Sequence, residues 1–230
     1  MKIYTHRGES NFASENTLKS FYLADFLEDD GIECDIRRTK DGVIVIIHDM
    51  TINRTSNGIG LLKDINYYEL IKYNFGTKKN FERIITLDEY LYLFSKKNIL
   101  MYIEIKEEGY EEDIVNIIKR YISDKITLIS FNYNILKNIR KINNEIKLAW
   151  LVFDFNKSIE IKSKEINLNE ILCPSLCLNK KKIKEIKDNN FKVGAWSVMN
   201  IKELDKLKSI GVDDIIWNSG YLGKKYLGEI

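Results

Sequence analysis

Short β-type runs alternate with amphipathic helical patterns along most of this 230-residue chain. We predict strands at Lys2–His6, Ile32–Arg37, Val43–His48, Leu100–Lys106, Ile126–Phe131, Lys147–Val152, Ile171–Ser175, Lys192–Val198 and Asp214–Trp217. We predict helices at Thr17–Glu28, Leu87–Lys97, Glu111–Tyr121, Tyr133–Lys141, Asn179–Asn189 and Ile201–Ser209, several with apolar residues at positions i, i+3, i+4 and i+7. Repeating βα units favour a parallel sheet covered by helices, either closed into a barrel or open and doubly wound.

The pair Asp41-Gly42 predicts a two-residue hairpin turn, because both central positions of such a turn need a positive φ. The run Val43–His48 is then the antiparallel return arm of a hairpin, which leaves eight strands for the main sheet. Eight strands close a (β/α)8 barrel, and 230 residues is close to the usual size of that fold. We therefore predict an α/β fold, a single TIM-barrel domain over 1–230, with a small insertion at 49–86 over the barrel mouth.

The charge balance bounds the choice of partner. The chain has 36 basic and 34 acidic side chains and a formal charge of +2, which favours neither nucleic acid nor a stably bound anionic membrane. No apolar run is long enough for a signal peptide or a membrane span, so we expect a cytoplasmic location. The three cysteines form no disulfide framework. The sequence leaves the oligomeric state open.

His6 and His48 are the only histidines in the chain. Imidazole exchanges protons near neutral pH, because its reference pKa is about 6.5. Two histidines are enough for one general acid and one general base. Taken alone, His6 is more typical of a partly buried structural histidine than of a catalyst.

Acidic residues follow the same strands. Glu33 and Asp35 are two residues apart on one predicted strand, so their side chains point to the same side. With a two-residue turn, Asp35 faces His48, whereas a slip of one residue would undo that pairing. Glu104 lies near the end of another strand, and strand ends in such barrels carry active sites. Three carboxylates without clustered histidine or cysteine suit Mg²⁺ or Ca²⁺ rather than zinc.

Each feature also has a purely structural interpretation. Glu33 and Asp35 could lie on an exposed sheet face, and Glu104 with Lys106 could form a surface ion pair. The expected convergence at one rim favours function, because unpaired carboxylates inside a barrel are costly.

Several stretches together make the sequence similar to the glycerophosphodiester phosphodiesterases, and they occur in that family's order over nearly the whole chain. They are His6-Arg7-Gly8, Glu15-Asn16-Thr17, Ile32-Glu33-Cys34-Asp35, Thr39-Lys40-Asp41-Gly42, His48-Asp49, Arg54-Thr55 with Gly58-Ile59-Gly60, Ile103-Glu104-Ile105-Lys106, Ser130-Phe131 and Ala195-Trp196-Ser197-Val198. The resemblance implies a (β/α)8 barrel that cleaves a glycerophosphodiester to sn-glycerol 3-phosphate and an alcohol such as choline or ethanolamine.

The same resemblance implies roles for individual residues. A divalent cation would be held by Glu33, Asp35 and Glu104. Phosphate would contact Arg7 and Lys106, and acid–base work would be shared by His6 and His48. Trp196 would line the pocket for the glycerol or alcohol moiety.

The chain departs from the family pattern at three places. Ser14 replaces a frequent proline, Met199 stands where asparagine is frequent, and Trp217-Asn218-Ser219-Gly220 replaces a Thr-Asp-X-Pro pattern. The last two put substrate preference in question. The rival hypotheses are a related barrel phosphodiesterase acting on lysophospholipids or phosphoinositides, and a non-catalytic module that binds phosphorylated metabolites.

Overall fold

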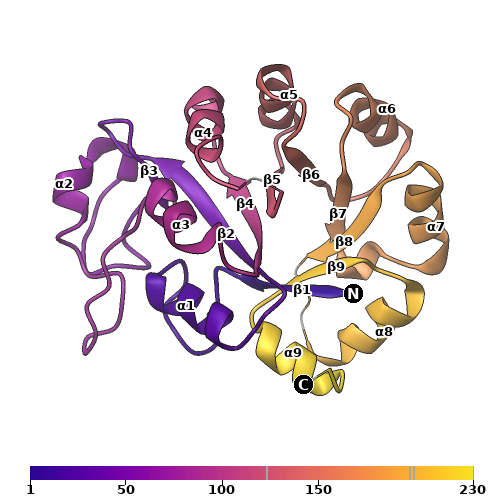
Figure 1. Ribbon diagram of the computed structural model, residues 1–230, viewed down its shortest axis with the longest axis horizontal. Coiled ribbons are helices and arrows are strands. Elements are labelled where there is room, and N and C mark those ends of the chain that lie inside the picture. The colour runs from indigo at the N-terminus through magenta and orange to yellow at the C-terminus, as the bar shows by residue number, and fades with distance from the viewer. Residues whose placement is uncertain (123, 197, 199, 230) are drawn as a thin grey trace.

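The structure is a computed structural model that describes residues 1–122, 124–196, 198 and 200–229. Within those residues, eight parallel strands form a ring in which β1 pairs with both β2 and β9 (Figure 1). They are β1 (Lys2–His6), β2 (Gly31–Arg38), β4 (Leu100–Ile105), β5 (Ile126–Ser130), β6 (Lys147–Leu151), β7 (Glu170–Pro174), β8 (Lys192–Trp196) and β9 (Asp214–Trp217). The closed ring confirms the predicted (β/α)8 TIM barrel.

Helices cover the outside of the ring (Figure 1). They are α1 (Leu18–Phe26), α3 (Leu87–Phe94), α4 (Glu111–Ile118), α5 (Tyr133–Ile142), α6 (Lys157–Glu165), α7 (Lys180–Asp188), α8 (Lys202–Ile210) and α9 (Gly220–Tyr226). The short helix α2 (Tyr67–Leu70) lies in the segment 49–86, at the left of Figure 1, and η1 (Leu62–Asp64) and η2 (Ser175–Cys177) are short 3-10 turns. The hydroxyls of Thr17 and Thr86 each accept the N–H of the third helical residue and so cap α1 and α3. Gly211, with φ +88°, ends α8 in the left-handed conformation that favours glycine.

The sequence prediction missed α6 and α9. The residues of α6 are strongly polar and only Ser163 among them is buried, so no apolar stripe reveals the helix. Two glycines, Gly220 and Gly223, lower the helix propensity of α9. The predicted strand Lys192–Val198 ends at Trp196 in the structure, and Ser197 lies outside the described residues.

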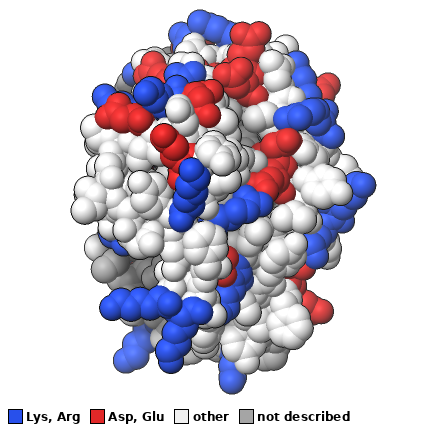
Figure 2. All heavy atoms as spheres, turned by 90° about the vertical axis from the view of Figure 1, so that its left-hand side faces the viewer, with Lys and Arg blue, Asp and Glu red and all other residues white. Residues whose placement is uncertain are grey.

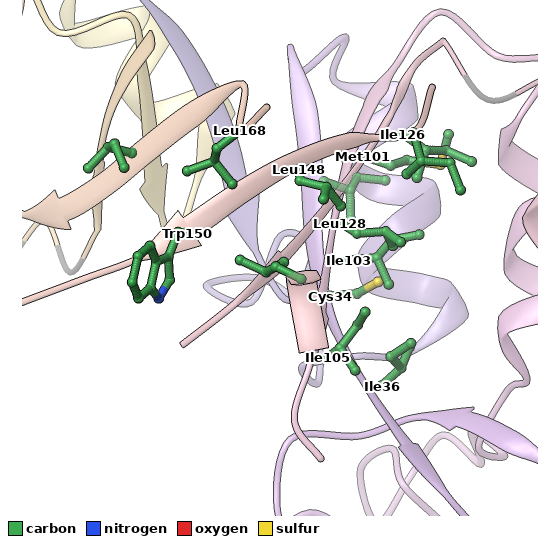
Figure 3. Close-up of a cluster of buried hydrophobic side chains, with 14 of the residues drawn as sticks. Cys34, Ile36, Met101, Ile103, Ile105, Ile126, Leu128, Leu148, Trp150 and Leu168 are labelled. Carbon is green, nitrogen blue, oxygen red and sulfur yellow. The ribbon is translucent and has the colours of Figure 1, made fainter. Parts of the chain in front are cut away.

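The main core lies between the ring and the helices. Outward-facing side chains of β2 and β4, such as Cys34, Ile36, Ile103 and Ile105, are buried there (Figure 3). The alternation of side chains along a strand then turns their neighbours, including Glu33, Asp35 and Glu104, toward the inside of the ring. This alternation is what positions the site.

The hairpin differs from its prediction by one residue. The remaining strand, β3 (Ile44–Ile46), is not part of the ring and pairs antiparallel with β2, so that Ile36 lies opposite Ile46. The loop has three residues, because Thr39 N–H donates to Val43 O at 3.0 Å and Gly42 takes φ +85°, as in a bulged hairpin. The predicted pairing of Asp35 with His48 is therefore wrong: Ile47 N–H donates to Asp35 O instead, at 2.9 Å.

The segment 49–86 follows this hairpin and packs against it in a small separate core. The buried cluster combines Ile52, Leu62, Leu70, Phe75 and Ile84 of the segment with Val45 of β3 and with Ile47, which follows that strand. Thr51 and Leu61 form an isolated antiparallel β-bridge within the segment. Figure 2 shows the molecule from the left-hand side of Figure 1: acidic and basic side chains are intermixed in the upper part of this face, and uncharged residues cover much of the rest. The location of the segment 49–86 over the barrel mouth stays a prediction.

None of the helices in the described part of the chain combines the length and the apolarity that crossing a membrane requires.

The interior of the barrel contains a buried polar group far from the strand ends that carry the predicted site. Tyr4 and Tyr102 stack at 3.7 Å between ring centroids, and the Tyr102 hydroxyl donates to Glu170 Oε2 at 2.7 Å. Burial and the neighbouring Asp214 raise the pKa of Glu170 to about 8. The folded protein therefore holds the proton of the Glu170 carboxyl group more tightly than the unfolded chain does, where the pKa of this group is near 4.5.

The raised pKa of Glu170 predicts how the free energy of unfolding changes with pH. The contribution of Glu170 to the free energy of unfolding should be fully present below about pH 4.5 and lost as the pH rises through about 8. Glu170→Gln, which keeps a hydrogen-bonding group without the ionisation, should be more stable than wild type at pH 8.5 and flatten the profile. Urea unfolding across this range measures it, with the exposed Glu145→Gln as control. Parallel profiles for Glu170→Gln and wild type would contradict the assignment.

Candidate active site

The three predicted carboxylates meet at one end of the barrel. In the paired strands, His6 lies beside Glu33 and Asp35 lies beside Glu104. Glu33, Asp35 and Glu104 are 8% exposed or less, and each offers a ligand atom within 4.8 Å of the other two. The structure thus brings together the acidic residues that the sequence had placed on two separate strands.

Two protein cations lie against these carboxylates. Lys106 Nζ lies 2.6 Å from Glu104 Oε1 and 3.0 Å from Asp35 Oδ1. Arg7 Nε lies 3.1 Å from Asp35 Oδ2, and the backbone N–H of Arg7 donates to Glu33 Oε2 at 3.0 Å. A buried carboxylate requires such partners, since desolvation of an unpaired charge is very costly.

The loop after β1 reaches the carboxylates through a strained backbone. Arg7 has φ +60° and Asn16 has φ +56°, in the left-handed region that costs most residues of order 1 kcal/mol or more. Gly8 follows with φ +77°, and a Cβ there would lie 2.4 Å from Ser20 Oγ. Asn16 Nδ2 donates to Asp35 Oδ2 at 3.0 Å. The strained residues are thus those whose polar groups contact the acidic cluster.

The electrostatics show an excess of negative charge. Burial, and then Asp35 and Glu104, raise the pKa of Glu33 well above its usual range. Burial raises the pKa of Glu104 to about 7 despite Lys106. Burial also pushes the pKa of Asp35 upward, but Lys106 and Arg7 outweigh it and the pKa is lowered. Three carboxylates face two cations, and all three donors are oxygens, so the residues fit a hard divalent cation such as Mg²⁺ or Ca²⁺.

Both histidines reach the same region. Nδ1 of His6 lies 3.0 Å from Asn218 Oδ1, and Nδ1 of His48 lies 2.7 Å from Asp49 Oδ1. Amide and carboxylate oxygens accept hydrogen bonds, so Nδ1 donates in each ring and the neutral ring has its lone pair on Nε2. Burial is the largest cause that lowers the pKa of each ring; Arg7 adds to it at His6, and Lys106 and Arg7 add to it at His48.

His48 arrives there although its predicted strand register is wrong. It lies beyond the end of β3, where the chain bends away from the antiparallel ladder. The guanidinium Nε of Arg37 donates to His48 O at 2.6 Å and holds that bend. His48 therefore reaches the site even though the observed strand pairing differs by one residue from the predicted one.

The site opens into a cavity of about 400 Å³ with two chemically different halves. The charged half is lined by His6, Arg7, Glu33, His48, Glu104 and Lys106. The other half is lined by Phe131, Leu151, Trp196, Val198, Ile216 and Trp217, and Asn218 lies next to His6. Trp196 Nε1 donates to Leu172 O at 3.1 Å, and the Trp196 ring meets Phe131 edge to face at 5.1 Å. The arrangement suits an anion next to an apolar or weakly polar group.

All eight predicted site residues lie in this region, counting Asp35 through its place in the acidic cluster. Sequence reasoning did not single out Asn16, Asp49, Arg54, Phe131 or Asn218 as site residues. The first four were present in the stretches that carry the family resemblance, and Asn218 was noted as a departure. Met199 lies outside the described residues.

Comparisons with known proteins agree with this geometry. The model of the glycerophosphoryl diester phosphodiesterase family matches residues 6–219. A glycerophosphodiester phosphodiesterase of Caldanaerobacter subterraneus subsp. tengcongensis is 33% identical over 230 residues, which cover 93% of this chain and 92% of the relative. One from Bacillus altitudinis is 30% identical over 232 residues, which cover 93% of each chain.

A solved structure is similar over the same extent. It is a phosphodiesterase of Oleispira antarctica in complex with the product sn-glycerol-3-phosphate, with a TM-score of 0.92 and 25% sequence identity. The similarity covers 99% of this chain and 97% of that chain. The family match over nearly the whole chain, with relatives of this identity, shows that the chain belongs to the glycerophosphoryl diester phosphodiesterase family and is an enzyme, a phosphoric diester hydrolase.

Proposed function

We propose that this enzyme hydrolyses glycerophosphodiesters to sn-glycerol 3-phosphate and an alcohol, with a divalent cation and with acid–base catalysis by two histidines. The observation that carries the proposal is the convergence of Glu33, Asp35 and Glu104 with both histidines in one cavity. The Oleispira antarctica relative, described with sn-glycerol-3-phosphate as its product, supports the same substrate class.

The charged half of the cavity would bind the phosphodiester. The guanidinium of Arg7 can contact two phosphate oxygens, and Lys106 adds a point charge beside them. Glu33, Asp35 and Glu104 would hold the cation, which when bound neutralises phosphate charge and stabilises charge that builds up in the transition state. Together these groups reduce the repulsion between the phosphodiester anion and the attacking oxygen.

The two histidines would divide the proton transfers. One neutral ring would accept the proton of the attacking oxygen, and the other, protonated, would donate to the leaving oxygen. A donor is required because an alkoxide is a poor leaving group at neutral pH. The attacking oxygen would belong to water or to the neighbouring glycerol hydroxyl, and the second route would give a cyclic phosphate first.

The apolar half of the cavity would take the glycerol or alcohol part of the substrate. Trp196 and Phe131 offer ring surfaces there, and Phe153, which is 71% exposed, packs against both at 5.6 Å. Because the rings and the carboxylates line one cavity, the phosphate would bind at the charged groups and the glycerol or alcohol part would lie against the rings.

The test is incubation of the protein with a panel of glycerophosphodiesters, with and without a chelator, followed by assay of sn-glycerol 3-phosphate. We expect release that the chelator abolishes and that Mg²⁺ or Ca²⁺ restores. Lysophospholipids and a glycerophosphoinositide belong in the same panel. Lysophosphatidic acid or inositol phosphate as the main product would favour the rival substrate class instead.

We predict that His6→Ala and His48→Ala each lower kcat by about 10²- to 10⁴-fold, the usual contribution of a positioned acid or base. Both rings line the cavity and belong to none of the hydrophobic clusters of the described residues, so the melting temperature should change little. Turnover and thermal unfolding, measured side by side, check this. Turnover close to wild type in either variant would remove that histidine from the mechanism.

We predict that Glu104→Gln weakens binding of Mg²⁺ or Ca²⁺ at least about tenfold, because it removes a charged oxygen ligand. Calorimetric titration measures the affinity without reference to turnover. Glu107→Gln is the matched control, since Glu107 follows the same strand but pairs with Arg37 at 3.0 Å. Equal affinities of Glu104→Gln and wild type would show that Glu104 is not a ligand.

A further inference from the structure

A single guanidinium in the segment 49–86 joins two parts of the chain that are distant in sequence. Arg54 Nη1 and Nη2 donate to the two carboxylate oxygens of Glu15 at 2.7 and 2.9 Å. Its Nε and Nη2 donate to the two oxygens of Asp49 at 2.7 and 2.9 Å. Glu15 belongs to the loop between β1 and α1, so Arg54 ties that loop to the residues that follow β3.

Each of these carboxylates also contacts a residue of the cavity. Glu15 Oε1 accepts from Arg7 Nη1 at 2.8 Å. Asp49 Oδ1 lies 2.7 Å from Nδ1 of His48. Basic and acidic side chains therefore alternate in one connected series, from Arg7 through Glu15, Arg54 and Asp49 to His48.

We propose that Arg54 is a positioning residue, which fixes the guanidinium of Arg7 and the imidazole of His48 relative to each other; this rests on the function proposed above. Arg54 does not line the catalytic cavity in the described structure, so it acts through Glu15 and Asp49. These two carboxylates approach the same Nη2 atom, and without the cation they would repel each other.

The geometry explains why arginine occupies this position. A guanidinium presents its donors in a rigid planar fork, so it can hold two carboxylates at once in fixed orientations. Lysine offers the same charge as a compact point on a flexible stem and cannot set both orientations. The side chain of Arg54 is 48% exposed, yet its Nε, Nη1 and Nη2 are all engaged. Arg54 therefore contributes more to the orientation of Glu15 and Asp49 than to the stability of the fold.

The test begins with kcat and KM for a glycerophosphodiester that wild type hydrolyses. Arg54→Ala should lower kcat about 10²-fold, the effect of a small misplacement of reacting groups, and should also raise KM through Arg7. Guanidinium chloride, well below denaturing concentrations, should restore part of the lost kcat, whereas ammonium chloride should not. Arg54→Lys should fall between Arg54→Ala and wild type.

Arg83→Ala is the matched control. Arg83 is a half-exposed arginine of the same segment and pairs with Glu89, away from the cavity. Its variant loses the same charge and should keep wild-type kcat, with no response to guanidinium. This separates positioning from a general effect of charge or stability.

A second readout uses the two histidines of the chain. With ¹⁵N-labelled histidine, the spectrum contains only the rings of His6 and His48. Arg54→Ala should shift the ring nitrogens of His48, whose partner Asp49 is released, and leave those of His6, held by Asn218, nearly unchanged. This readout does not depend on turnover.

The outcomes distinguish the two proposals. If wild type hydrolyses no glycerophosphodiester, the proposed function fails, while the His48 signals still test the positioning role. If wild type is active and Arg54→Ala keeps its kcat within about twofold, the positioning role is overturned. A loss of kcat that guanidinium does not restore, with unchanged His48 signals, overturns it as well.

Discussion

Burial of three carboxylates at one end of a closed sheet is the constraint on which the rest of this structure depends. Glu33, Asp35 and Glu104 lie nearly inaccessible to water within 4.8 Å of one another, and their repulsion must be offset by cations. Lys106 and Arg7 provide part of the compensation. A fold selected for stability alone would place apolar side chains at these positions, so the arrangement supports the proposed binding of a divalent cation and of an anionic substrate.

The same constraint explains the shape of the surrounding loops. The chain after β1 adopts the left-handed backbone conformation at Arg7, whose N–H donates to Glu33. Asn16 adopts the same conformation, and its side-chain amide donates to Asp35. Such strain persists only where neighbouring contacts over-determine it. The chain after β3 bends at His48 and is tied back through Arg37. Rigid strands thus set the carboxylates, and the loops bring the histidines and cations to them.

The sequence predicted the barrel, and which residues lie together at one end of it, better than it predicted the individual side-chain contacts. Regular alternation placed Glu33 and Asp35 on one face without any three-dimensional information. The pair Asp41-Gly42 marked the hairpin, but a positive φ at Gly42 serves three-residue loops as well as two-residue ones, so the register was wrong. The contacts of Arg54 and Asn218 join segments far apart in the chain, and no local pattern encodes them.

The central claim is that these carboxylates bind one divalent cation beside the paired histidines. Crystals grown with Mn²⁺, which prefers oxygen ligands as Mg²⁺ does, would test it through the anomalous scattering of the metal. The account predicts one strong anomalous peak between Glu33, Asp35 and Glu104, with the Lys106 ammonium displaced from its present contacts. An empty cluster, with Mn²⁺ bound elsewhere or nowhere, would contradict it.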